Sequence, residues 1–146
     1  VVVVPNDTPN VNFSLEPGGS ISGYIYQADG VTPVAEAYVV AHSLDIDYSR
    51  SGIVNADGSY SITCLPVGQY RVSAAADGYV SEYFNNSFLS SQHTPVSVTS
   101  FSNTANINFS LDIGGSISGH VYQAVGINPV ADAYVWVSLI DGDYGK

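Results

Sequence analysis

A segment of 32 residues occurs twice in this chain, and the second copy follows the first 96 residues later without insertion or deletion. Residues 10–41 and 106–137 are identical at 21 of 32 positions. Each copy contains the motif Gly-Gly-Ser-Ile-Ser-Gly, which begins at Gly18 in the first copy and at Gly114 in the second. A period of 96 residues is the length of a whole domain and exceeds the roughly 20 to 50 residues of a solenoid repeat. The sequence therefore predicts domains in tandem.

The repeat sets the expected domain boundaries. We expect residues 1–17 to be the terminal strand of a preceding unit, or a donor strand, because Val11, Phe13 and Leu15 alternate with polar residues at the period of a half-buried strand. Residues 18–113 are expected to form one complete unit, and residues 114–146 the first two strands of a next, truncated unit. Two strands alone leave apolar faces and edges exposed, so more of the same chain or another copy would complete that unit.

Short alternating segments bounded by turn residues fill the complete unit, and no segment has the helical period. About seven short strands are expected, near residues 21–26, 35–41, 52–55, 60–64, 70–74, 79–84 and 96–98, before the repeated strand at residues 107–111. Gly23 on an inward position indicates a close backbone approach or a bulge. Cys64 alternates with Tyr60 and Ile62 and is expected to be a small buried hydrophobe. The spacing predicts an all-β fold, an antiparallel β-sandwich.

Composition narrows the classes of protein and partner. Only 11% of the residues are charged, against about 25% in an ordinary soluble domain. Three Lys and Arg residues stand against 13 Asp and Glu residues, giving a net charge of −10. Nucleic acid and anionic lipid require clustered cations, so we expect neither as a partner. The composition favours an extracellular or cell-surface protein, and the apolar Val1–Val4 is far shorter than the ~20 residues of a membrane span, so no membrane insertion is expected.

Five motifs occur in a fixed order, and the first of them begins with the glycine pair Gly18-Gly19. They are Gly-Gly-x-Ile-x-Gly from Gly18, Pro-Val-Ala-x-Ala-x-Val from Pro33, Asp-Gly-x-Tyr from Asp57, Leu-Pro-x-Gly-x-Tyr-x-Val from Leu65, and Asp-Gly-Tyr from Asp77. This order resembles the carboxypeptidase regulatory-like domain. The resemblance implies an Ig-like, prealbumin-like (transthyretin-like) β-sandwich, related to the Cna B-type repeats of bacterial surface proteins.

The same resemblance implies a non-catalytic module, usually in tandem within secreted or surface proteins, with no catalytic residues to assign. B-type repeats often carry a Lys–Asn isopeptide bond. No lysine precedes Lys146, which excludes such a bond inside the complete unit.

Aromatic residues on the outer face of the expected first two strands are the main candidates for a contact site. They are Tyr24, Tyr26 and Tyr38 in the first copy, and Tyr122, Tyr134 and Trp136 in the second. If the two strands pair, these side chains form an exposed stripe of the kind that marks contacts. Packing between units is favoured, a sheet face on which tyrosine is simply common comes next, and stacking on sugar rings comes third.

Other constellations favour solvated polar residues over chemistry. Ser, His and Asp occur without a Gly-x-Ser-x-Gly elbow, so no catalytic site is expected. Asp45 and Asp47 recur as Asp141 and Asp143, but calcium needs six to eight oxygen ligands. We therefore expect no metal and no cofactor. Of the Asn-x-Ser/Thr sequons, Asn85 in a polar loop is the best candidate for glycosylation.

The sequence thus predicts a non-catalytic structural repeat of an extracellular microbial surface protein that builds a stalk, adhesin or filament. The expected partners are neighbouring copies of the same chain, head to tail and with possible strand complementation, in a heterologous contact that propagates if it does not close. The alternative is a carbohydrate-binding accessory module of a secreted enzyme, with polysaccharide as its partner.

Overall fold

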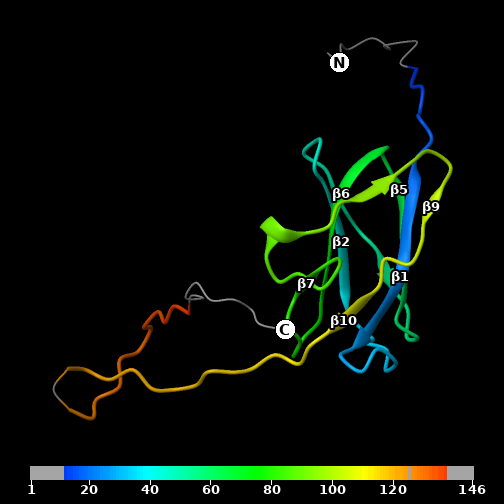
Figure 1. Cartoon of the computed structure of the whole chain (residues 1–146). Helices are drawn as coiled ribbons and strands as arrows, with labels where there is room; N and C mark the ends of the chain where they lie inside the picture. The colour runs from blue at the N-terminus through cyan, green and yellow to red at the C-terminus, as the bar shows by residue number, and fades with distance from the viewer. Residues whose placement is uncertain (1–11, 125, 138–146) are drawn as a thin grey trace, which may run out of the picture. The chain divides into compact units, whose positions relative to one another are not determined.

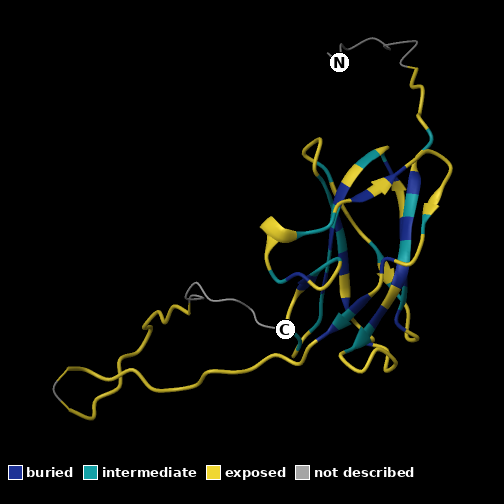
Figure 2. Cartoon of the chain, viewed as in Figure 1, coloured by how far each residue is buried: buried dark blue, intermediate teal, exposed yellow. Residues whose placement is uncertain are grey.

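The structure is a computed structural model, and it describes residues 12–124 and 126–137. The chain divides into two units, Val1–Gly114 and Gly115–Lys146, here called the first and second unit. All buried residues among those described lie between Gly19 and Leu111 (Figure 2). The first unit therefore closes its core with its own strands.

Ten strands and one short 3-10 helix make up the first unit in the described residues (Figure 1). They are β1 (Gly19–Gln27), β2 (Tyr38–Ser43), β3 (Ser49–Ser51), β4 (Ile53–Val54), β5 (Ser59–Leu65), β6 (Gly68–Ala75), β7 (Glu82–Tyr83), η1 (Ser90–Gln92), β8 (Val96–Val98), β9 (Asn103–Thr104) and β10 (Phe109–Leu111). The all-β prediction is confirmed, but the expected count of about seven strands is too low. β3 and β9 are short and largely exposed, so they carry no apolar alternation in the sequence.

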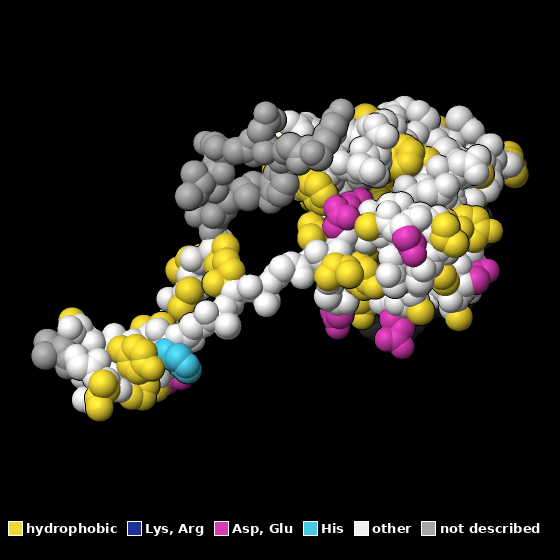
Figure 3. Space-filling model, turned by 60° about the horizontal axis from the view of Figure 1, so that its bottom comes forward, with side chains coloured by type: hydrophobic (Ala, Val, Ile, Leu, Met, Phe, Trp, Pro, Cys, Tyr) yellow, Lys and Arg dark blue, Asp and Glu magenta, His cyan; other side chains and the backbone are white. Residues whose placement is uncertain are grey.

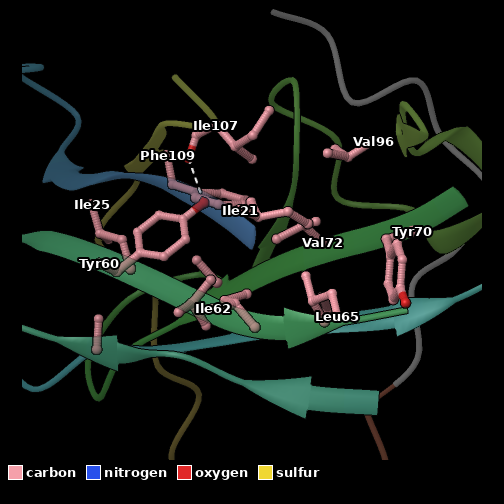
Figure 4. Packing of buried hydrophobic residues seen from close by; sticks show 14 of the residues in the cluster. Ile21, Ile25, Tyr60, Ile62, Leu65, Tyr70, Val72, Val96, Ile107 and Phe109 are labelled. Atoms are coloured by element: carbon pink, nitrogen blue, oxygen red, sulfur yellow. Dashed lines mark hydrogen bonds between the residues drawn. The ribbon is translucent and has the colours of Figure 1, made fainter. Parts of the chain in front are cut away.

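Two sheets pack against each other around one core. The first has the order β10-β1-β5-β4, with β9 also on β1, and the second has the order β3-β2-β6-β7, with β8 also on β6. Side chains from both sheets interdigitate between them (Figure 4). The largest buried ones are Tyr70, Phe109, Ile21, Ile25, Ile62, Leu65 and Leu111.

The first and last strands of the unit are neighbours and run in the same direction. β10 pairs with β1 in parallel, with Ile25 opposite Phe109 and Gln27 opposite Leu111. β9 also pairs with β1 in parallel, so the expectation of a purely antiparallel sandwich is wrong at this edge. The chain consequently enters the sandwich where β1 begins and leaves it at the opposite end, where β10 ends (Figure 1). We call these the leading end and the trailing end.

The close backbone approach predicted at Gly23 is confirmed. A Cβ atom on Gly23 would lie 2.1 Å from the carbonyl oxygen of Ile107. The segment between β9 and β10 is drawn onto β1 here, because the Ile107 N–H donates to the Ser22 carbonyl at 3.1 Å. The buried Tyr60 hydroxyl donates to the Ile107 carbonyl at 2.5 Å from the other side (Figure 4).

Cys64 is exposed, contrary to the expectation that it points into the core. The β1–β5 register shifts here, with Gly19 opposite Leu65 but Ile21 opposite Ile62. Cys64 has a φ of 58°, in the left-handed region. The extra residue makes a β-bulge, which turns Cys64 outward and places Leu65 in the core instead.

The second unit repeats the local structure that follows β1 in the first. The Gln123 N–H donates to the Asn128 carbonyl at 3.0 Å, and the Val130 N–H donates to the Val121 carbonyl at 2.9 Å. The residues 96 positions earlier make the same two bonds in the first unit. The two segments, which differ at three of the eight positions from Gln27 to Val34, thus make the same two backbone bonds.

Apolar residues of the second unit and of residues 12–18 are exposed, whereas their equivalents in the first unit are buried. Ile117 is 82% exposed, whereas its equivalent Ile21 is fully buried. Residues 12–18 hold no strand, and Phe13 is 83% exposed while its equivalent Phe109 is 2% exposed. Val11 lies outside the described residues, and the assignment of residues 1–17 to a preceding unit stays a prediction.

Candidate functional site

The tyrosines expected to form one stripe lie on two separate surfaces. Tyr24 and Tyr26 occupy the outer face of β1, with their rings stacked at a centroid distance of 5.6 Å and an interplanar angle of 6°. Tyr38 begins β2, which belongs to the other sheet. Because β1 and β2 do not pair, the prediction of one continuous stripe is wrong. Outward side chains of strands in opposite sheets point to opposite sides of a sandwich.

Tyr38 instead takes part in a shallow cavity of about 150 Å³ over the second sheet. Its lining includes Ser73 and Ala75 from β6 and Tyr83 from β7. The Arg71 guanidinium lies over the Tyr83 ring, 5.5 Å from its centroid, a distance at which a cation is attracted to the ring face. Sequence reasoning missed Tyr83 and Arg71, since strand pairing alone brings β6 and β7 beside β2.

The aromatic candidates of the second unit are all exposed. Tyr122 lies beside His120, with ring centroids 5.9 Å apart, and Tyr134 and Trp136 are each about nine-tenths exposed. No described contact gives them a partner within that unit beyond this ring pair. Their role as contact residues stays a prediction.

Asn85 lies in an exposed turn after β7, with a left-handed φ of 73°. Its side-chain amide donates to the Thr94 hydroxyl at 3.2 Å. Ser87, the third residue of the sequon, is nearly buried and its hydroxyl donates to the Leu89 carbonyl at 3.0 Å. Glycosylation at Asn85 would require this turn to open locally, and it stays a prediction.

The acidic loop between β2 and β3 accepts a hydrogen bond from the backbone of β6. The Asp45 carboxylate accepts the N–H of Gln69 at 2.9 Å. Within residues 12–124 and 126–137, no three or more His, Cys, Asp and Glu side chains gather in a way that could hold a metal ion. Asp141 and Asp143 lie outside the described residues. In the same part of the chain, no helix is long and apolar enough to cross a membrane.

The trailing end of the sandwich is acidic. The Thr32 hydroxyl and backbone hold the pKa of the Asp29 carboxyl below its usual value, and the Ser59 hydroxyl and backbone do the same for Asp57. Figure 3 turns this end toward the viewer and shows acidic side chains with apolar ones between them. The remaining exposed carboxylates at this end are Glu36, Asp77 and Asp112.

Glu82 is a carboxylate in the core beside the point where β10 ends. It is 2% exposed, and burial, followed by the nearby charge of Asp112, raises the pKa of Glu82 to about 7. The Asp112 backbone N–H donates to the Glu82 carboxylate, whereas Oε2 of Glu82 has no hydrogen-bond partner.

The chain stays attached to the trailing end beyond β10. The Val80 N–H donates to the Asp112 carbonyl at 2.8 Å, and the Gly114 N–H donates to the Gly78 carbonyl at 2.8 Å. Tyr79 and Ile113 form an antiparallel bridge between these bonds. The loop Gly78–Val80, here called the trailing loop, therefore holds residues 112–114 against the first unit.

The leading end carries an open depression of about 640 Å³. Its lining residues are Leu15, Glu16, Pro17, Gly18, Cys64, Pro66, Val67 and Ser100. Beside it, the Phe101 N–H donates to the Gly18 carbonyl at 3.1 Å. Phe101 is 87% exposed and has a left-handed φ of 56°, and Val67 is 59% exposed. A large apolar side chain on a residue with a left-handed φ is unusual.

The family described as carboxypeptidase regulatory-like domain matches residues 20–112, a span that runs from β1 to the end of β10. This match covers well over half of the chain. The chain belongs to the carboxypeptidase regulatory-like domain family.

No curated protein sequence matches the chain. Among solved structures, one similar chain belongs to an N-terminal interface mutant of a type II cohesin–X-dockerin complex from Acetivibrio cellulolyticus, with 19% identity, a TM-score of 0.43, and coverage of 66% of this chain and 59% of that chain. A second belongs to a C-terminal interface mutant of that complex, with 20% identity, a TM-score of 0.39, and coverage of 62% and 53%. The chain thus spans little more than half the length of these chains.

Proposed function

We propose that this chain is part of a non-catalytic structural protein on a microbial cell surface, in which sandwiches of this kind follow one another end to end and form a stalk, adhesin or filament. One observation carries the proposal. Because β1 and β10 pair in parallel, the chain enters the unit at one end and leaves it at the other. A domain connected in this way lengthens the molecule with each copy.

The short connection between successive copies supports this order. Only Asp112, Ile113 and Gly114 separate β10 from Gly115, the equivalent of the first residue of β1. Three extended residues span about 10 Å. The nine residues of β1 span about 30 Å, so the chain cannot return to the leading end before the next copy begins.

The second unit supports the assignment of residues 114–137 to the start of a further sandwich. It has the same sequence at most positions and forms the same turn as the first unit. Residues 12–15 repeat residues 108–111 in the same way. In this proposal they complete the first sheet of a preceding unit, either within one longer chain or as a donor strand for a neighbouring copy.

Surface composition supports an elongated particle rather than a cluster. The net charge of −10 disfavours contacts between the long sides of acidic sandwiches. The low charged fraction and the usual setting of the family favour an extracellular or surface location.

Electron microscopy of a chain of four units tests the proposal. Each unit should add about 30–40 Å to a rod one sandwich wide, because the strands run along the axis. Compact clusters of four units would contradict it.

The cavity over the second sheet favours carbohydrate binding as a second candidate function. Tyr38 and Tyr83 line it with aromatic rings, and Ser73 offers a hydroxyl. Sugar rings stack on exposed aromatic faces. Tyr38→Ala should abolish binding on a panel of polysaccharides while Tyr24→Ala, on the other sheet, leaves it unchanged. Equal binding by wild type and both variants, or none by any, would exclude this site.

A further inference from the structure

We propose that the depression at the leading end is a socket that receives the trailing loop, Gly78–Val80, of the preceding copy. The proposal names the surface through which successive units contact each other. It rests on the end-to-end order proposed above.

The first step is the equivalence of the chain on both sides of the joint. Asp112, Ile113 and Gly114 are bound to the trailing loop of their own unit. Their equivalents, 96 residues earlier, are residues 16–18. The same hydrogen bonds made one copy earlier would place a trailing loop alongside residues 16–18.

The second step is that residues 16–18 line the depression. Together with Leu15 they form one side of it, and residues of the β5–β6 turn and of the segment after β8 form the other. A loop bound to residues 16–18 therefore lies at this depression. The occupant is the trailing loop of a second copy.

The third step concerns the glycine at the joint, which is Gly18 in the first copy and Gly114 in the second and which bonds to the units on both sides. Gly114 gives its N–H to the unit before it, and Gly18, its equivalent, gives its carbonyl to the Phe101 N–H of the unit after it. A Cβ on Gly18 would lie 2.8 Å from the Leu65 carbonyl oxygen, and one on Gly114 would lie 3.4 Å from the Gly78 carbonyl oxygen. The 2.8 Å approach leaves no room for a Cβ, whereas 3.4 Å is an ordinary contact distance, so it is the unit after the joint that requires glycine at this position.

The two surfaces also match in polarity. The socket presents Val67 and Pro66, and the strained, exposed Phe101 lies beside it. The trailing end presents Ile113 and Val80, with 75% and 36% exposure, beside Tyr79. Covering these apolar groups on both sides removes them from water. The joint then has no freely rotating residue, and the array is stiff.

Cys64 reports on the socket, since it lines the depression and is the only cysteine of the chain. The test uses a two-unit chain in which residues 18–113 follow residue 113 directly, each unit closing its own core. Cys64→Ser in the preceding unit leaves one thiol in the socket of the following unit. Its reaction with N-ethylmaleimide should be at least about tenfold slower than that of Cys64 in the 146-residue chain.

The matched control carries Cys64→Ser in the following unit instead, so that the remaining thiol lies in an uncovered socket. It should react as fast as the 146-residue chain. Adding Val67→Asp and Phe101→Asp to the following unit should restore fast reaction in the covered socket, with the melting temperature of the unit kept as a check of folding. Equal rates in the two single-thiol chains would overturn the proposal.

X-ray scattering from the same samples separates this proposal from the one on which it rests. An extended two-unit particle with a fast-reacting Cys64 means that the units lie in line without using the socket. A particle no longer than one unit contradicts the end-to-end order itself.

Discussion

Gly23 illustrates how one residue type can depend on a distant backbone segment. Its missing Cβ leaves room for the Ile107 carbonyl, which the Tyr60 hydroxyl also binds. The motif around Gly23 looks the same in both copies, yet only the first copy has this neighbour. In the second unit nothing lies within 4 Å of a Cβ built on Gly119.

Gly23→Ala should therefore lower the free energy of unfolding by about 2–4 kcal/mol, because the added methyl group must displace backbone. The measurement is chemical denaturation of the full chain. Gly119→Ala is the matched control and should leave the transition of the first unit unchanged. Equal effects of the two substitutions would mean that the Gly23 contact is wrong.

Glu82 is the residue whose ionisation should affect stability most. Its pKa rises from the ordinary 4.5 to about 7 on folding, so the folded state holds the proton more tightly than the unfolded chain does. Its contribution is greatest below about pH 4.5 and is lost as the pH rises through 7. The loss is on the order of 3 kcal/mol, because one pKa unit corresponds to about 1.4 kcal/mol.

Glu82→Gln should remove this component, so that the difference in unfolding free energy between variant and wild type grows in favour of the variant from pH 4.5 to about pH 7, the interval between the two pKa values. Thermal unfolding across that interval measures it. Glu36→Gln, at an exposed site, should follow the wild type. A constant difference across the interval would show that Glu82 is already ionised in the folded chain.

Cys64 marks the limit of sequence reasoning at this scale. Strict alternation from Tyr60 and Ile62 places it in the core, but the β-bulge opposite Gly19 reverses the alternation. A bulge depends on the partner strand, so the segment that carries it gives no local signal. Gly23 was predictable because a glycine on an inward position of a strand is itself unusual.

At the scale of elements, strand positions were largely predictable and their neighbours were not. The inward residues of β1, β6 and β8 alternate clearly and are buried as expected. Pairing is non-local, however. The sequence gives no sign that β1 lies beside β5 and β10 while β2 lies beside β3 and β6, and the predicted aromatic stripe failed for this reason.

The pairing of β10 with β1 can be tested with two equivalent residues. Phe109→Ala should cost about 3–5 kcal/mol of unfolding free energy, since the ring is fully enclosed in the core. Phe13→Ala, its counterpart 96 residues earlier, should change the stability of the first unit by less than about 0.5 kcal/mol because Phe13 is exposed. A large effect of Phe13→Ala in the 146-residue chain would mean that residues 12–15 pack within this chain after all.

At the scale of the whole molecule, the repeat period and the parallel edge of the first sheet act together. The period predicts that the same unit recurs, and in the proposed array the parallel pairing of β1 with β10 decides at which end of a unit the next one starts. Sequence reasoning supplied the period and the family, and the boundaries near residues 18 and 113 stay a prediction. It could not supply the ends at which the chain enters and leaves the unit, because these depend on which strands pair with β1.

The central claim is that the units lie end to end, and small-angle X-ray scattering of the two-unit chain tests it most directly. With about 40 Å for one sandwich and its loops, the account predicts a maximum dimension of about 80 Å and a scattering profile typical of a stiff rod. A maximum dimension near 50 Å, as expected for two sandwiches side by side, would contradict it.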